Sequence, residues 1–342
     1  MRHKIICGDT LEVLKELPSE SVDTIVTSPP YWKLRSYLPD DHPKKILEIG
    51  QESTLDEYIS HLLEITKELK RVLKKTGVMF WNHDTNKINL CDTMQNYRLI
   101  LKMIDEQGWL MPKKGPIIWF KQSHMPDSFK RGFTHSYEPI FMLVKDRSYW
   151  FNLDAVRVPH KEASKKRVLR AVSNKHKYMN HPEYGGGGGI NKPRPNSKRK
   201  VSVKLTDLFD KSKRYHREQN MAISQYQYAE GDYLVVNLHP LGANPGDVWS
   251  VSTQSFKGEH FAVFPERLIL PLIKVGSRQN DTVLDPFGGS VTVGVVAEKL
   301  ERNSIIIDIN ENYCEMAYRR IKSIASQTKL FREPSVIERI GF

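Results

Sequence analysis

The chain has few cysteines and no long apolar run, and each shortage excludes a class of protein. Its three cysteines, Cys7, Cys91 and Cys314, lie far apart without a CxxC pair, which argues against a disulfide framework and a cysteine-based zinc site. No apolar stretch approaches the ~18 residues of a membrane span. The first nine residues lack the apolar core of a signal peptide. We therefore expect a cytoplasmic protein without membrane contact.

The sequence also shows no histidine cluster, no internal repeat and no composition typical of extensive disorder. The 12 histidines are scattered, and the closest approach to a metal pair is His176 and His181 in a polar loop, so we expect no metal. Hydrophobic residues make up 39% of the 342 residues, enough for a real core. This length suits one large α/β domain with an insertion, or two domains.

Positive charge, by contrast, is abundant and concentrated in one segment. The formal net charge is +12, and residues 160–217 hold 17 Lys and Arg against 4 Asp and Glu. The remainder of the chain is therefore close to neutral. Aromatic residues are interleaved with these charges, and such a cluster attracts a polyanion. We expect this segment to bind nucleic acid. The alternative, a charged surface that contacts only solvent, is less favoured.

The N-terminal 150 residues alternate strand and helix patterns. Strands are predicted at residues 4–7, 22–27, 78–81, 117–120 and 140–144. Helices are predicted at residues 11–17 (capped by Thr10), 55–74 (ended by Gly77) and 92–107. This alternation predicts an α/β fold, with a parallel or mixed sheet that has helices on both faces.

The next two parts differ from this block and from each other. Residues 151–237 are basic and poor in periodicity. They contain five glycines at 185–189 that follow no strand and open no helix, so they form a flexible hinge or loop tip and no dinucleotide site. Residues 238–342 regain globular character, with strands at 282–285 and 304–308 and helices at 292–300 and 311–323. We expect three parts, 1–150, 151–237 and 238–342.

A rigid corner, Ser28-Pro29-Pro30-Tyr31, follows the predicted strand at 22–27. Neither proline can donate to a ladder, so the strand ends here, at the edge where open α/β sheets bind ligands. Ser28 and the Pro29 carbonyl can accept hydrogen bonds from an amino group, and Tyr31 offers a face for a flat ring. The alternative is a structural turn that only ends the strand.

A second cluster of candidate residues surrounds the glycine loop at 286–290. Glycines in the loop let the backbone approach a ligand closely, and the N-terminus of the following helix faces the same ligand. Asp308 ends the next strand, 23 residues after Asp285, where it can hold ribose hydroxyls. Asp285 would repel a phosphate, but it suits a cofactor with a cationic amino-acid end. The pattern therefore favours a nucleoside cofactor with such an end.

Taken together, these segments resemble the β-class amino-methylating DNA methyltransferases, which methylate cytosine N4 or adenine N6. Ser28–Tyr31 resembles their catalytic corner, and residues 285–292 resemble their S-adenosylmethionine loop, Asp-Pro-Phe-x-Gly-Ser-Gly-Thr. Residues 5–9, 135–138, 244–249 and 260–266 match further stretches in the family's order. The resemblance covers about 1–150 and 238–325. It implies a Rossmann-like S-adenosylmethionine-dependent methyltransferase fold, circularly permuted, with the catalytic half first, a basic target-recognition insertion, and the cofactor half last.

The resemblance assigns roles to individual residues. The catalytic residues are Ser28, Pro29, Pro30 and Tyr31. The cofactor-binding residues are Asp9, Asp285, Phe287, Gly289, Ser290, Asp308, His260 and Phe261. The DNA-binding residues of the basic segment are Lys198, Arg199, Lys200, Arg214 and Arg217. Residues 135–138 belong to the wall of the target-base pocket. The chain departs from the family at Val291, where glycine is usual and a Cβ is expected to narrow the loop or shift the cofactor.

The implied reaction transfers a methyl group from S-adenosyl-L-methionine to N4 of a flipped cytosine in double-stranded DNA. Serine at the first position of the corner favours cytosine, since the family's adenine enzymes mostly carry aspartate there. A homodimer, a separately encoded cognate restriction endonuclease and a nucleoid-associated location are further expectations. Three alternatives stay open: an adenine-N6 enzyme, a methyltransferase for RNA or a glutamine amide, and a DNA-binding relative without activity.

Overall fold

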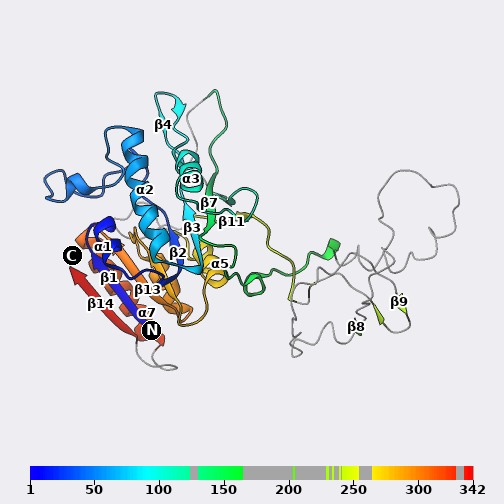
Figure 1. Ribbon diagram of the computed structural model, residues 1–342. Helices are drawn as coiled ribbons and strands as arrows, with labels where there is room; N and C mark the ends of the chain where they lie inside the picture. The colour runs from blue at the N-terminus through cyan, green and yellow to red at the C-terminus, as the bar shows by residue number, and fades with distance from the viewer. Residues whose placement is uncertain are drawn as a thin grey trace. The chain divides into compact units, whose positions relative to one another are not determined.

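A mixed β-sheet of nine strands carries most of the described chain (Figure 1). Its strand order is β11-β6-β7-β3-β2-β12-β13-β1-β14. From β3 to β14 neighbouring strands run parallel, whereas β7 is antiparallel to both β3 and β6. The strands are β1 (Arg2–Cys7), β2 (Val22–Thr27), β3 (Leu73–Asn82), β6 (Ile117–Phe120), β7 (Tyr137–Val144), β11 (Val248–Ser250), β12 (Thr282–Asp285), β13 (Asn303–Asp308) and β14 (Val336–Gly341).

The computed structural model describes residues 1–123, 130–164, 203–204, 229–230, 233–234, 239, 241–253, 264–328 and 335–341. The chain groups into two compact units, residues 1–156 with 246–342, and residues 157–245. The described strands of the second unit, β8 (Val203–Lys204), β10 (Tyr233–Leu234) and β9 (Ala229–Glu230), pair antiparallel. The division into parts at residues 150 and 237 stays a prediction.

Helices cover both faces of the large sheet, as the alternation predicts. The helices α1 (Thr10–Glu16), α2 (Leu55–Val72) and α3 (Gln95–Asp105) pack into one hydrophobic cluster. The helices α5 (Glu266–Gly276), α6 (Thr292–Lys299) and α7 (Glu311–Thr328) pack into the other. Successive residues of β3 alternate between the two clusters, with Val78 and Phe80 facing α5–α7 and Met79 and Trp81 facing α1–α3, because side chains in a strand point alternately to opposite faces. Among the described helices, none has the length and apolarity that crossing a bilayer requires.

Three predicted helix boundaries are wrong, each for a local reason. Thr10 does not cap α1, because the Asp9 side chain accepts from the Glu12 N–H at 3.0 Å and takes that role. Helix α2 ends at Val72, and Gly77 lies inside β3, where a Cβ would meet the Asp23 carbonyl oxygen at 2.9 Å. Helix α3 begins at Gln95, after the short hairpin of β4 (Lys87–Ile88) and β5 (Cys91–Asp92).

The first and last strands of the chain are neighbours in the sheet. Strand β1, drawn in blue, pairs in parallel with β14, drawn in red (Figure 1), and on its other side with β13. Strand β14 was not predicted, because its residues are mostly exposed and do not form a buried apolar run. The first strand of the chain therefore belongs next to the segment that carries Asp308, while β2 pairs with β12 and brings the Pro-Pro corner beside Asp285.

Candidate functional site

Four neighbouring parallel strands end at one edge of the sheet and surround a cavity. Strands β2, β12, β13 and β1 are adjacent in that order, so their carboxyl ends meet. The cavity has a volume of about 740 Å³. Its lining includes every predicted catalytic and cofactor residue within the described chain: Ser28, Pro29, Pro30, Tyr31, Asp9, Asp285, Phe287, Gly289, Ser290 and Asp308. The fold therefore brings the two predicted clusters together at one site.

Seven predicted site residues lie outside the described residues. They are His260, Phe261, Lys198, Arg199, Lys200, Arg214 and Arg217. Their roles in binding the cofactor and DNA stay predictions.

Asp308 is held in place by backbone donors from the glycine loop and from the turn after β13. Its Oδ2 accepts from the Gly289 N–H at 2.7 Å, and its Oδ1 accepts from the Asn310 N–H at 2.8 Å. Burial raises the pKa of Asp308 to about 6. The side chain of Asn310 in turn donates to the Tyr37 carbonyl at 2.9 Å, so the loop after the Pro-Pro corner is tied to the same acid. Sequence patterns alone did not indicate this tie.

Asp285 is the second carboxyl of the site, and it is almost fully buried, whereas Asp308 is half-buried. Its Oδ1 accepts from Thr27 Oγ1 at 2.7 Å and from the Phe287 N–H at 3.2 Å. Burial, with a smaller repulsion from Asp308, raises the pKa of Asp285 to about 7. Two carboxyls with raised pKa values are suited to a cationic ligand, because a nearby positive charge favours their ionisation.

Val291 faces the core and not the cavity, which corrects the expectation that its Cβ narrows the cofactor loop. The side chain is fully buried in the cluster of α5–α7 and is not part of the cavity lining. It packs over Gly294, where an added Cβ would lie 3.0 Å from Val291 Cγ2. The backbone of Val291 is left-handed, with φ 62° and ψ 23°, a conformation that a β-branched residue adopts only under strain.

This strain leads to a prediction about stability. Glycine and alanine at residue 291 both lose the buried methyl groups of valine. Glycine relieves left-handed strain of about 1–2 kcal/mol, whereas alanine keeps this strain. We therefore expect Val291→Gly to be more stable than Val291→Ala, the reverse of the usual order inside a helix. Both variants should bind S-adenosylmethionine within about twofold of the wild type, because no contact of the cavity changes. Thermal unfolding and titration calorimetry measure the two quantities, and an affinity loss of about tenfold or more would place the side chain in the ligand's path.

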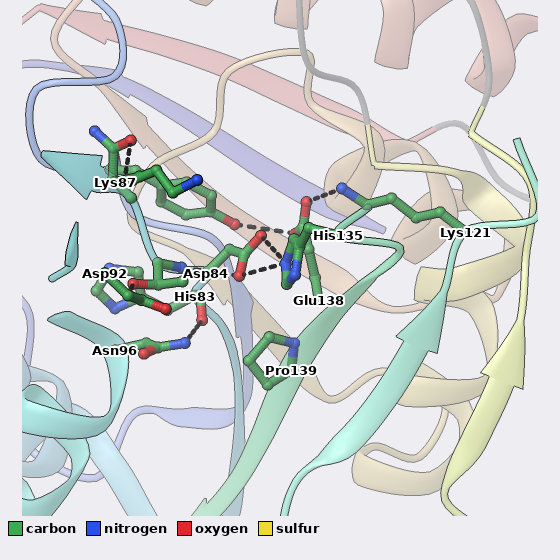
Figure 2. A network of polar contacts seen from close by, with 12 residues as sticks. His83, Asp84, Lys87, Asp92, Asn96, Lys121, His135, Glu138 and Pro139 are labelled. Carbon is green, nitrogen blue, oxygen red and sulfur yellow. Dashed lines mark hydrogen bonds and ion pairs between the residues drawn. The ribbon is translucent and has the colours of Figure 1, made fainter. Parts of the chain in front are cut away.

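The Pro-Pro corner is joined to β7 and β6 by a line of polar contacts. Ser28 Oγ donates to the Tyr31 hydroxyl at 3.2 Å, and that hydroxyl donates to Glu138 Oε2 at 3.1 Å. Lys121 forms an ion pair with the other oxygen of Glu138, as Figure 2 shows. Burial, with repulsion from Glu138 and Asp84, raises the pKa of Tyr31 well above its ordinary value. The phenol therefore keeps its proton at neutral pH.

A second set of contacts fixes the corner from behind. The Tyr58 hydroxyl donates to the Pro30 carbonyl at 2.7 Å and lies 3.0 Å from His83 Nε2. Since that hydroxyl has one proton, His83 Nε2 must carry a hydrogen and donate to it. Trp81 Nε1 donates to His83 Nδ1 at 3.4 Å, which agrees with this tautomer. Burial lowers the pKa of His83 to about 3, so the ring stays neutral.

Asp84, which follows β3, and His135, which precedes β7, are part of a third group of polar residues in the site (Figure 2). His135 Nε2 lies 3.0 and 3.1 Å from the two oxygens of Asp84, and this contact raises the pKa of His135. Asn82 Nδ2 donates to the Pro139 carbonyl at 3.1 Å. The buried Oδ1 of Asn82 has no partner among the described residues. Asp84, Asn82 and His135 all line the cavity, which gives this wall both acceptors and a basic group.

Sequence reasoning identified residues 135–138 as a wall but missed Tyr58, His83 and Lys121. One signal for His83 was available, because Asn82-His83-Asp84 follows directly after a buried strand, where polar residues gather in α/β folds. Tyr58 follows the apolar pattern of α2 and gives no such signal. Over the described residues, no group of three or more His, Cys, Asp or Glu side chains could hold a metal ion.

Comparisons with known proteins agree on one family. A family model described as DNA methylase matches residues 22–319. The type II methyltransferase M.SfiI of Streptomyces fimbriatus is 29% identical, and the alignment covers 90% of this chain and 88% of that protein. The DNA adenine methyltransferase YhdJ of Escherichia coli K12 is also 29% identical, with 93% and 82% covered.

Solved structures share the fold at lower identity. The cytosine-N4-specific PvuII DNA methyltransferase superposes with a TM-score of 0.58 at 18% identity, over 99% of this chain and 95% of that one. A DNA modification methylase of Thermus thermophilus, complexed with S-adenosyl-L-methionine, gives a TM-score of 0.52 at 18% identity, over 98% and 99%.

Proposed function

The chain belongs to the DNA methylase family, and on that premise we propose that it methylates N4 of a flipped cytosine in double-stranded DNA at a specific site. S-adenosyl-L-methionine is the methyl donor. The observation that carries the proposal is the single cavity in which the Ser28–Tyr31 corner meets Asp285 and Asp308. A strand-ending turn without function has no reason to share a cavity with two carboxyls whose pKa values are raised.

The residues of the glycine loop fit this cofactor. Asp308, tethered to Gly289 and Asn310, is the candidate for the ribose hydroxyls. Asp285 is the candidate for the cationic methionine end, because its burial makes it responsive to a positive charge. When bound, the cofactor supplies an electrophilic methyl group on a positively charged sulfur. Asp9, Phe287 and Ser290 complete the predicted contacts.

The corner suits the chemistry of an amine attached to an aromatic ring. The lone pair of such an amine is delocalised into the ring, so acceptors for its two hydrogens are needed to make it nucleophilic. Ser28 Oγ and the Pro29 carbonyl are these acceptors, while the Pro30 carbonyl is engaged by Tyr58. The methyl group that the cofactor would supply replaces one hydrogen of the amine, and that hydrogen leaves as a proton to solvent, so Ser28 and the Pro29 carbonyl need only accept hydrogen bonds. Positioning supplies much of the rate, and stacking on Tyr31 contributes ~1–3 kcal/mol.

The second candidate is methylation of adenine N6 by the same site. Its support is the similarity to YhdJ, whose name states an adenine methyltransferase. Serine at position 28 and the fold of the cytosine-N4-specific PvuII enzyme favour cytosine.

Five finer features complete the proposal. The catalytic β2 precedes the cofactor-binding β12 and β13 in the chain while lying beside them in the sheet, which supports the circularly permuted order. Residues 151–237, which contain the basic cluster at 160–217, are the target-recognition segment. A cognate restriction endonuclease encoded separately is the expected partner, given the type II methyltransferases among the relatives. A DNA substrate suggests a cytoplasmic, nucleoid-associated location, and a homodimer stays an expectation.

Salt dependence tests the role of the basic segment. Each phosphate contact contributes about −0.9 to the slope of log affinity against log salt. Replacing Lys198, Arg199 and Lys200 together with glutamine should make this slope shallower by about two units or more. Fluorescence anisotropy with duplex DNA at several salt concentrations measures it.

A matched variant keeps the charge comparison fair. Glutamine at Lys102, Lys113 and Lys114, which are exposed outside the basic segment, removes the same charge and should change the slope much less. Equal slopes for wild type and the first variant would show that these three residues do not touch phosphate.

Sequencing DNA from cells that express the protein tests the proposed function itself. Wild type should leave N4-methylcytosine at one recurring sequence, and Ser28→Ala should leave much less of it at the same level of expression. Equal modification in both samples, or none in either, would contradict the proposal.

A further inference from the structure

A line of hydrogen bonds sets the direction of the Ser28 hydroxyl. Glu138 forms an ion pair with Lys121, so its carboxylate can only accept. The Tyr31 hydroxyl must therefore donate to Glu138, over 3.1 Å. Its oxygen is then left to accept from Ser28 Oγ, at 3.2 Å. Each member of the line has one direction available to it.

The consequence falls on the atom that faces the substrate. With its proton directed to Tyr31, Ser28 presents only lone pairs to the cavity. A hydroxyl free to rotate would expose either a proton or a lone pair, and an exposed proton would repel the hydrogens of an incoming amine. The neighbouring Pro29 carbonyl can only accept, so the two groups together offer the amine acceptors alone.

We propose that Lys121 and Glu138 act as positioning residues that hold Ser28 as an obligate hydrogen-bond acceptor for the target amine. The proposal rests on the amine-methylating function above. Since the Ser28 proton is committed to Tyr31, Ser28 reads the amine and does not donate to the ring nitrogen next to it.

Reversing the line is the sharpest test, and Glu138→Gln reverses it. Lys121 can only donate, so it donates to the oxygen of the new glutamine amide, and the amide NH₂ then points towards Tyr31. Tyr31 then donates to Ser28, and the Ser28 proton is directed at the substrate. The single-turnover methylation rate should fall about 100-fold, with KM for DNA and cofactor little changed.

Tyr31→Phe breaks the line instead of reversing it, because the ring stays and only the hydroxyl is lost. Ser28 then rotates freely, and the rate should fall only about tenfold. In that background Glu138→Gln has no route to Ser28. The double variant should therefore be as active as Tyr31→Phe and about tenfold faster than Glu138→Gln alone. Ser28→Ala combined with Glu138→Gln should likewise match Ser28→Ala.

The control and the opposing outcomes separate this proposal from the proposed function. Glu106→Gln removes a carboxylate from an exposed pair with Lys102 outside the cavity lining, and it should retain full activity. Wild type that methylates no DNA overturns the function. If the wild type is active, two results overturn the positioning role. One is a Tyr31→Phe/Glu138→Gln double variant that is slower than either single variant, and the other is a Glu138→Gln variant that is as fast as Tyr31→Phe. If Tyr31→Phe does not fold, the pair with Ser28→Ala decides in the same way.

Discussion

Replacing Ser28 with alanine should lower the rate of methyl transfer by about 10²- to 10³-fold, the usual cost of losing one preorganised group at a reacting atom. The affinity for S-adenosylmethionine should stay within about twofold, because the loop at residues 285–290 lies on neighbouring strands and does not depend on the hydroxyl. Tyr31→Ala should show the same pattern, since it removes the stacking face as well as the link to Glu138. Single-turnover kinetics with labelled cofactor, and calorimetry for binding, measure the two effects.

A surface serine provides the matched control for this experiment. Ser60 is exposed on α2 and donates to the Asp56 carbonyl, so Ser60→Ala should keep the wild-type rate. If Ser28→Ala and Tyr31→Ala both keep full activity, the corner is only a strand-ending turn and the catalytic assignment is wrong.

Asp285→Asn should weaken cofactor binding by about tenfold or more at pH 8, because a charged hydrogen bond contributes roughly 1.5–3 kcal/mol. Asparagine keeps an acceptor for Thr27 and Phe287, so the loop should hold its shape. With the pKa of Asp285 raised to about 7, binding of a cationic ligand near pH 7 should release a proton from the wild type. Calorimetry in two buffers of different ionisation enthalpy measures that proton, which should be reduced or absent in the variant.

The same substitution should raise the stability of the unliganded protein. The pKa of Asp285 is about 7 in the folded protein and about 4 in the unfolded chain, so between these values the folded state binds the extra proton. Protonated Asp285 therefore contributes stability that is fully present below about pH 4 and is lost as the pH rises through about 7. Asp285→Asn should therefore raise the melting temperature most at pH 8 and little at pH 4. Asp56→Asn, on the exposed first turn of α2, is the control. A variant that binds as tightly as wild type and gains no stability at pH 8 would contradict the site.

The elements that position the site could be predicted because their signals are local. Strands β2 and β12 are short buried runs that end shortly before Pro29 and Pro286, and β13 ends at Asp308. Buried runs of this kind specify a central strand with little help from distant residues. The meeting of the Pro-Pro corner with both acids then follows from parallel pairing.

The remaining features depend on contacts between distant segments, which no local pattern contains. The partners of Tyr58 and Glu138 lie 28 and 107 residues away along the chain. The direction of the Val291 side chain follows from a left-handed backbone that glycine at 294 makes room for. Strand β14 pairs with β1 across almost the whole chain. In each case the determining interaction forms only after the sheet has assembled.

Identifying the methylated nucleoside is the most direct test of the central claim. Purified protein is incubated with unmethylated duplex DNA and S-adenosylmethionine, the DNA is digested to nucleosides, and the products are identified by chromatography and mass. The account predicts N4-methyldeoxycytidine, formed by wild type and formed at least about 100-fold more slowly by Ser28→Ala. N6-methyldeoxyadenosine as the sole product would contradict the choice of base, and the absence of any methylated nucleoside would contradict the proposed activity.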